Sequence, residues 1–195
     1  MDSELDVSAE DYSDSRRLQW LALLLTPGVG ASRGRRLVMQ FETIDRVFSA
    51  SLTELEAAGL PAAAAQRLAL GQSLERAAEE ADRVAKQGAH LLVPSDRGYP
   101  RQLLEIYDPP LVLYVKGDWQ LLENPGIAVI GTRHPTPYGT GMAERLACDL
   151  ASHGLIIISG MARGVDTAAH RGALAARGKT IAVWGTGIDE VYPRE

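Results

Sequence analysis

Two glycine-rich segments of this chain carry the residue types best suited to chemistry: Gly131-Thr132-Arg133 and Ser159-Gly160-Met161-Ala162-Arg163-Gly164. Glycine lets a bulky anion approach backbone amides, and an arginine guanidinium matches a phosphate group with two parallel hydrogen bonds. Both segments therefore predict a phosphate-binding site. A second interpretation stays open, in which the glycines only allow close packing between strand and helix and both arginines are solvated.

Enzyme signatures are absent from these segments. The spacings Gly-x-Gly-x-x-Gly, Gly-x-x-x-x-Gly-Lys-Ser/Thr and Gly-x-Ser-x-Gly do not occur, which weighs against a redox enzyme or an NTPase. Asp166 and His170 have a spacing that can orient an imidazole as a base, but the helix dipole also favours an acid near a helix N-terminus. His90, His134 and His153 lack the spacing of metal ligands, so we expect no metal site and no cofactor.

The elements that must position these segments form a βαβαβ pattern. Three apolar strands are predicted at residues 127–130, 155–158 and 181–184, and two helices at 138–152 and 165–176. Such a pattern indicates an α/β fold with a Rossmann-like parallel sheet. Ligands of these sheets bind at the carboxyl ends of the strands, where both glycine-rich segments lie.

A small all-helical domain is predicted at residues 16–88, after a disordered acidic leader at 1–15. The first helix stops at Thr26-Pro27-Gly28-Val29-Gly30, and Ser32 is expected to cap the second. Together with the arginines that follow, this turn resembles a helix-hairpin-helix motif, whose backbone amides can receive DNA phosphates. A helical turn with a solvated basic face is the alternative. The spacing of apolar residues changes from a helical to a strand-like pattern after Gly88. We therefore place the boundary of a second domain, residues 89–195, at this point.

Charge and hydropathy limit the class of protein. The net charge is −5, but six of the 25 acids lie in residues 1–14, so the remaining 19 acids face 20 bases. A local basic surface is therefore compatible with the composition. The apolar run at residues 21–25 is too short to span a bilayer, and we expect a cytoplasmic protein without membrane contact.

Further motifs extend the pattern over the second half of the chain. They are Tyr99-Pro100 with Leu103 and Leu104, Pro109-Pro110-Leu111 through Lys116-Gly117, Ile127 to Arg133, Thr136-Pro137-Tyr138-Gly139, Ser159 to Asp166 with Ala169-His170, and Gly185-Thr186-Gly187 with Tyr192-Pro193. With these motifs the chain resembles the DNA-processing protein A family, also called DprA or Smf. The similarity is dense from Asp96 to Glu195 and looser from Leu18 to Leu60, where Glu42 stands at a position that we expect to be glycine.

The resemblance implies a non-enzymatic cytoplasmic protein that binds single-stranded DNA, brings the recombinase RecA onto it and protects incoming DNA in natural transformation. It also implies a homodimer and a chain that continues past Glu195, so that the Rossmann-like DNA-binding domain at 89–195 is truncated at its C-terminal end. Arg133 is expected to contribute most to DNA binding. The DNA-binding residues that the resemblance implies are Gly131, Thr132, Arg133, Ser159, Gly160, Arg163 and Gly164.

Two other functions remain as alternatives. Similar Ser-Gly turns occur in Rossmann-like phosphoribohydrolases, so a nucleotide-processing enzyme is the first, with Asp166 as its only candidate carboxylate at a turn. The second alternative is a protein-interaction module formed by residues 1–88, in which the acidic leader contacts a basic partner.

Overall fold

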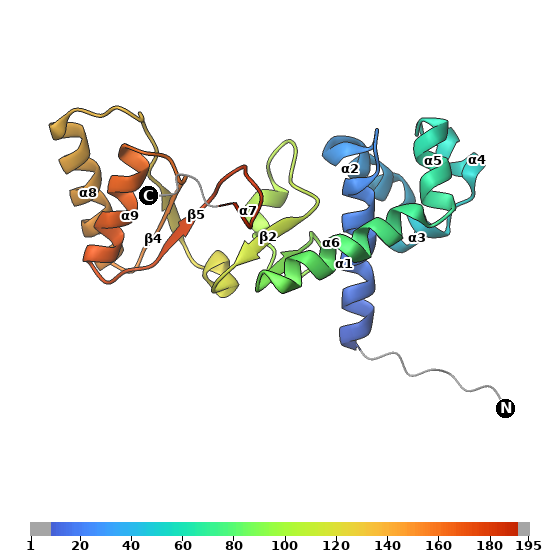
Figure 1. The fold of residues 1–195 in the computed structure, drawn as a ribbon, viewed down its shortest axis with the longest axis horizontal. Helices are drawn as coiled ribbons and strands as arrows, with labels where there is room; N and C mark the ends of the chain where they lie inside the picture. The colour runs from blue at the N-terminus through green and yellow to red at the C-terminus, as the bar shows by residue number, and fades with distance from the viewer. Residues whose placement is uncertain (1–8, 191–195) are drawn as a thin grey trace. The chain divides into compact units, whose positions relative to one another are not determined.

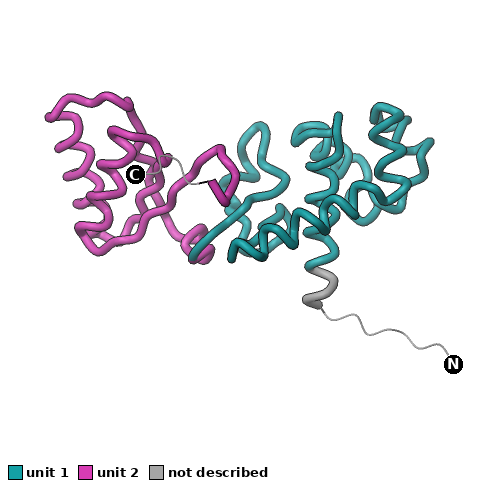
Figure 2. Tube along the Cα trace, in the orientation of Figure 1, with its two compact units in different colours: residues 1–117 teal, residues 118–195 magenta. Residues whose placement is uncertain are grey.

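The structure is a computed structural model that describes residues 9–190, with side chains from Asp14 to Glu190. The leader at residues 1–8 and the Tyr192-Pro193 motif lie outside the described residues. The chain divides into two compact units, residues 1–117 and 118–195 (Figure 2). The helices that begin the first unit are α1 (Ala9–Leu25), α2 (Gly30–Phe41), α3 (Ile44–Ser49), α4 (Leu52–Ala57), α5 (Ala62–Ala69) and α6 (Gln72–Lys86) (Figure 1).

Helix α1 begins earlier than the acidic composition predicts. It already includes Ala9, whereas the sequence pattern places the start of the helical region after residue 15. Asp14 illustrates the physical reason, because its carboxylate pairs at 2.8 Å with Arg17, one turn further along the helix. The Nε atom of Arg17 also lies 3.0 Å from Asp96, which ties α1 to the segment after the first strand. Tertiary contacts thus support a helix that its composition alone does not favour.

The turn between α1 and α2 follows the predicted stop of the first helix. Leu25 is the last residue of α1, and Gly28 and Gly30 adopt positive φ angles of 86° and 63° that glycine takes without steric cost. Helix α2 already begins at Gly30, so the cap predicted at Ser32 is wrong. The Ser32 hydroxyl lies inside the helix and donates a hydrogen bond to Asp108 at 3.0 Å instead.

Two strands complete the first unit. Strand β1 (Ala89–Leu92) pairs antiparallel with β2 (Leu113–Lys116), and the short helix α7 (Arg101–Leu104) lies between them in the sequence. The Tyr99 hydroxyl donates to the Pro110 carbonyl at 2.7 Å and closes the connecting segment. This sheet is separate from the parallel sheet, so β1 and β2 are not strands of the Rossmann-like sheet.

The β1–β2 pair packs with the helices. Leu111, 2% exposed, belongs to the apolar core of the helical unit. Burial, followed by the charge of Glu80 on α6, raises the pKa of Tyr114 on β2 to about 12. These contacts explain why the two units divide after Gly117, later than the boundary near Gly88 that the sequence pattern predicts.

The second unit contains the predicted βαβαβ arrangement. Its elements are the 3-10 helix η1 (Trp119–Glu123), β3 (Gly126–Ala128), α8 (Pro137–Ser152), β4 (Ile156–Ser159), α9 (Val165–Ala175) and β5 (Thr180–Ala182). The three strands are parallel in the order β3-β4-β5, which confirms the predicted α/β class. Both ends of each strand lie within three residues of the predicted ends.

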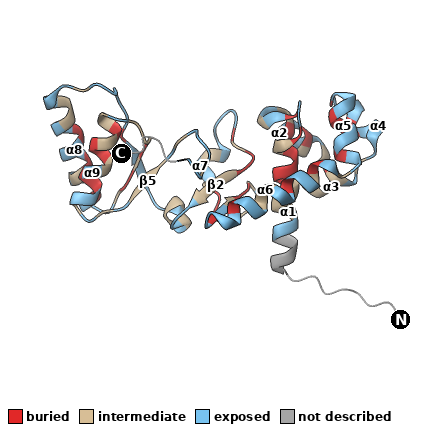
Figure 3. Ribbon diagram, viewed as in Figure 1, coloured by how far each residue is buried: buried red, intermediate tan, exposed pale blue. Residues whose placement is uncertain are grey.

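Helices α8 and α9 cover one face of this sheet (Figure 1). The strand order β3-β4-β5 steps across the sheet in one direction, and right-handed connections, the general rule for parallel strands, then place both helices on the same side. The helices approach closely, because a Cβ atom at Gly172 would overlap the carbonyl oxygen of Glu144. Figure 3 shows buried segments along α9 and along α1 of the first unit. The core of the second unit contains Val129, Ala147, Ala151, Ile157, Ala169 and Ala173.

Candidate nucleic-acid interface

The first loop of the candidate site joins β3 to α8. Thr136 caps α8, because its hydroxyl oxygen accepts a hydrogen bond from the Gly139 N–H at 3.1 Å. Thr132 makes a smaller turn upstream, where its hydroxyl oxygen accepts from the His134 N–H at 3.1 Å. These two bonds order the loop around Arg133, whose side chain is exposed.

The second loop joins β4 to α9. Gly164 precedes the helix with a φ of 89°, and no side chain caps the helix there. The Thr167 hydroxyl reaches back from α9 and donates to the Ala162 carbonyl at 2.9 Å, which holds the loop against the helix. Because no side chain caps the first turn of α9, the positive end of the helix dipole faces the loop directly.

The two loops contact each other through their backbones. The Val165 N–H donates to the Thr132 carbonyl at 3.2 Å. A Cβ atom at Gly164 would overlap that carbonyl oxygen and lie 2.9 Å from the Cα of Arg133, and a Cβ at Gly131 would lie 2.8 Å from Val165. Glycine is therefore required at both positions for packing, as the second interpretation of the sequence expected. The same packing brings the two predicted segments together into one surface.

Three backbone N–H groups on this surface have no hydrogen-bond acceptor within the described part of the chain. In residues 9–190, no hydrogen bond accepts the N–H groups of Met161, Ala162 and Gly164. Successive N–H donors without an acceptor, beside an uncapped helix start, form a cradle of the kind that binds an anion. Residue-type motifs do not point to Met161 and Ala162, because a ligand contact there would involve backbone rather than side-chain groups.

The two arginines lie on the touching loops and are exposed. Among the described ion pairs, none involves Arg133. Since no carboxylate of residues 14–190 forms an ion pair with this guanidinium, Arg133 is a candidate ligand for an anion. Arg163 stands one residue before Gly164, so both cations border the free N–H groups of the second loop.

Ser159 occupies a different position from the other candidate residues. It is 3% exposed, and its hydroxyl donates to the Val129 carbonyl at 2.6 Å. This bond connects β4 to the end of β3 and leaves the hydroxyl inside the sheet. Ser159 therefore aligns the two strands from which the loops leave, and a direct contact with phosphate stays a prediction.

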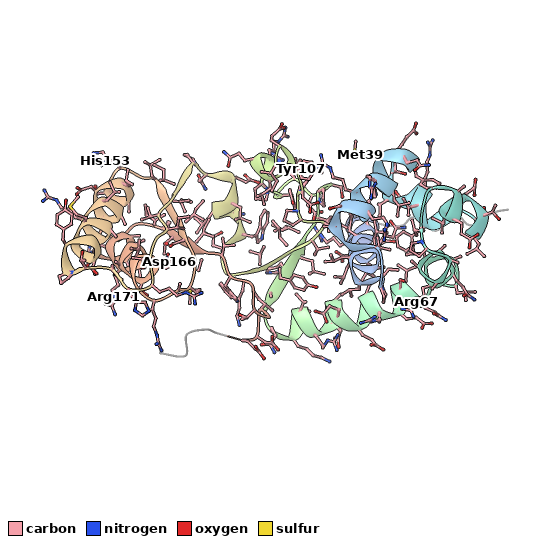
Figure 4. All side chains as sticks on the ribbon, turned by 90° about the horizontal axis from the view of Figure 1, so that it is seen from above. Met39, Arg67, Tyr107, His153, Asp166 and Arg171 are labelled. Atoms are coloured by element: carbon pink, nitrogen blue, oxygen red, sulfur yellow. The ribbon has the colours of Figure 1, made fainter. Side chains whose placement is uncertain are left out.

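Asp166 lies in the first turn of α9 and is 7% exposed (Figure 4). Its carboxylate lies directly against Gly160, where a Cβ atom would be 2.5 Å from Oδ2. His170 makes its hydrogen bonds elsewhere: Nε2 lies 2.8 Å from the Gly160 carbonyl oxygen and Nδ1 lies 2.7 Å from the Thr180 hydroxyl. Both ring nitrogens are thus engaged, and Asp166 does not orient His170 as a base. Thr180 was not singled out in the sequence, because a hydroxyl residue at the start of a strand is a common feature.

The turn between α1 and α2 carries part of the predicted basic face. Arg33 donates to the Gly28 carbonyl within the turn, and Arg35 donates to the Tyr107 carbonyl at 3.1 Å. Arg36 is exposed. Two of the three arginines therefore stabilise the first unit itself, and a DNA contact at this turn stays a prediction.

Two kinds of feature are absent from the described residues. No group of three or more His, Cys, Asp or Glu side chains is arranged to hold a metal ion. No helix there has the length and apolar character needed to cross a membrane.

The fold and the loops define a class of protein: a Rossmann-like α/β unit with two touching glycine-rich loops, preceded by a helical unit. The family model described as DNA recombination-mediator protein A matches residues 90–195. This chain belongs to that family, and the resemblance to the DprA/Smf family is confirmed.

Relatives named Smf and DprA show the same relationship. Protein Smf of Synechocystis sp. is 35% identical over 193 residues, which cover 93% of this chain and 47% of the relative. DNA processing protein DprA of Streptococcus pneumoniae is 48% identical over 99 residues, which cover 51% of this chain and 35% of the relative. The X-ray structure of DprA from Streptococcus pneumoniae superposes with a TM-score of 0.72 at 30% identity, covering 94% of this chain and 60% of that one. The chain thus spans less than half the length of these curated relatives.

Proposed function

We propose that this chain binds single-stranded DNA through its phosphate backbone and serves in a recombination mediator. The observation that carries the proposal is the contact between the two loops, which places the exposed Arg133 beside the free N–H groups of Met161, Ala162 and Gly164. These donors match phosphate oxygens and include no group arranged to read base edges. Binding is therefore sensitive to salt and only weakly dependent on sequence.

The resemblance to the family extends the proposal to the whole protein. In its full-length form the protein acts in the cytoplasm as a homodimer, brings RecA onto single-stranded DNA and protects incoming DNA during natural transformation. Membership of the recombination-mediator family supports these roles. Within this chain, the candidate DNA ligands are Gly131, Thr132, Arg133, Gly160, Arg163 and Gly164, with Ser159 aligning the strands behind them.

The substitution Arg133→Ala in the full-length protein tests the phosphate contact. We expect it to weaken oligonucleotide binding at low salt by about tenfold, the order associated with one charge-assisted hydrogen bond. The logarithmic slope of affinity against salt should also fall by about 0.7, because one phosphate contact is lost. Fluorescence anisotropy with labelled single strands of several sequences, measured over a range of salt concentrations, gives both quantities.

Arg145→Ala is the matched control. Arg145 is also an exposed arginine of the second unit, but it lies within α8 and faces Asp149 at 3.9 Å. Its removal should leave the affinity and the salt slope unchanged. Equal binding by the Arg133 variant and the wild type would show that this arginine does not contact phosphate.

A nucleotide-processing enzyme of the phosphoribohydrolase type is a second candidate, favoured by the buried Asp166 carboxylate against Gly160. The engagement of both His170 nitrogens leaves this carboxylate without a partner base. Incubation of folded protein with a panel of nucleoside monophosphates tests this function. If chromatography detects no free base, the enzyme hypothesis is removed.

A further inference from the structure

His170 connects three segments around the second loop through hydrogen bonds of 2.7 to 2.8 Å. Its Nε2 atom contacts the Gly160 carbonyl, and its Nδ1 atom contacts the Thr180 hydroxyl at the start of β5. The Thr180 hydroxyl in turn lies 2.7 Å from the Ile157 carbonyl of β4. We propose that His170 and Thr180 are positioning residues that fix the Gly160 carbonyl and thereby aim the Met161 N–H at a DNA phosphate. This inference rests on the proposed function.

The geometry of the peptide group links the imidazole to the ligand. The Gly160 carbonyl and the Met161 N–H belong to one planar trans peptide, so they point in opposite directions. A carbonyl oxygen can only accept, so Nε2 of His170 donates and holds this oxygen on the side of α9 and β5. The Met161 N–H must then point to the other side of the loop. No acceptor for that N–H exists among the described residues, as a ligand-binding donor requires.

The Thr180 hydroxyl fixes the orientation of the ring. An imidazole with one hydrogen bond can still swing about that bond, whereas contacts at both nitrogens leave one orientation. The Thr180 hydroxyl oxygen lies 2.7 Å from both Nδ1 and the Ile157 carbonyl oxygen, and its single proton serves one of these two acceptors at a time, so the ring stays next to the central strand of the sheet. Gly160 needs this support, because glycine restrains its own backbone less than any other residue.

Side-chain charge is not part of this mechanism, and this separates His170 from Arg133. When a neutral backbone donor is lost, affinity falls, but DNA binding still releases the same number of counterions from the DNA. The dependence of affinity on salt therefore stays the same. Loss of Arg133 lowers both the affinity and the salt slope. A purely structural role for His170 would instead lower the stability of the second unit and leave the affinity of the folded protein unchanged.

The test compares four variants of the full-length protein: His170→Ala, Thr180→Val, Thr180→Ser and Arg133→Ala. We expect His170→Ala and Thr180→Val to weaken binding of a single-stranded oligonucleotide by about three- to tenfold, with the wild-type salt slope. Thr180→Ser keeps the hydroxyl and should restore wild-type affinity, whereas valine keeps only the shape. Thermal unfolding confirms that each variant is folded at the temperature of the measurement.

A second measurement covers the case in which His170→Ala fails to fold. Amide hydrogen exchange in Thr180→Val should accelerate at Met161 and Ala162 relative to Thr180→Ser. Wild-type affinity and wild-type exchange in Thr180→Val, alongside weakened binding by Arg133→Ala, would overturn the positioning role and leave the proposed function intact. Absence of oligonucleotide binding by the wild-type protein would overturn both.

Discussion

At the scale of single residues, the candidate site depends on how closely two backbones can approach. Gly164 has a φ of 89°, and its Cα lies against the carbonyl of Thr132. Both a positive φ and the absence of a side chain are therefore needed at this position. The arginine supplies charge, but the glycine decides whether the two loops form one surface.

Gly164→Ala tests this requirement. The added methyl group meets both backbone strain and the Thr132 carbonyl, so we expect the free energy of unfolding to fall by about 2–4 kcal/mol, together with loss of oligonucleotide affinity. Urea denaturation and fluorescence anisotropy measure the two effects.

Gly154→Ala provides the comparison for the Gly164 variant. Gly154 has a similar φ of 84°, but its Cβ would meet nothing within 4 Å. Only backbone strain of about 1 kcal/mol is expected there, with unchanged DNA affinity. Equal losses of stability in the two variants would argue against a steric role for Gly164.

At the scale of secondary-structure elements, helix α2 ends in a strained conformation. Glu42 follows Phe41 and has a φ of 69°, which lies in a region that residues other than glycine rarely adopt. The position is the one at which the family resemblance leads us to expect glycine. The Glu42 carboxylate pairs with Arg46 on the surface, but such exposed pairs contribute little to stability.

Glu42→Gly should therefore stabilise the first unit by about 1 kcal/mol, because relief of strain outweighs loss of the exposed ion pair. Glu42→Ala separates the two effects, since alanine loses the ion pair but keeps the positive φ. We expect the alanine variant to remain within about 0.5 kcal/mol of the wild type. Chemical denaturation followed by circular dichroism measures these differences, and a destabilised glycine variant would contradict the strain argument.

At the scale of the whole molecule, the division into two units differs from the change of sequence pattern near Gly88. The β1–β2 pair looks like the start of the α/β domain, but its neighbouring apolar residues complete the helical core. Leu111 packs so closely on α2 that a Cβ at Gly34 would lie 2.6 Å from its Cδ1. Val93 and Val112 are 0% and 6% exposed in the same core.

Two fragments distinguish these boundaries. Residues 1–117 should unfold cooperatively, whereas residues 1–88 lack Val93, Leu111 and Val112 and should lose about 2 kcal/mol for each missing buried side chain. The shorter fragment should also bind an apolar dye through its exposed core. Calorimetry of both fragments measures the difference, and equal transition temperatures would support a boundary near Gly88.

The sequence by itself determined the local features of this protein. Apolar runs, helical periodicity and turn residues predicted the parallel sheet, α8, α9 and the stop of α1 at Leu25, because these features depend on neighbours within one or two turns. The glycine-rich segments and Arg133 were proposed as a phosphate site from residue type alone, and that role stays a prediction. The cap at Ser32 was predicted wrongly, because Ser32 lies inside α2 and its hydroxyl donates to the distant Asp108.

Only the tertiary structure decided how these pieces combine. It brought Gly164 against Thr132, turned the Ser159 hydroxyl into the sheet and gave His170 two partners other than Asp166. Each of these contacts joins residues at least ten positions apart along the chain, which periodicity does not encode. Residue type thus identifies the two glycine-rich segments as candidates, but the single surface that they form follows from the packing of two loops at the carboxyl end of one sheet.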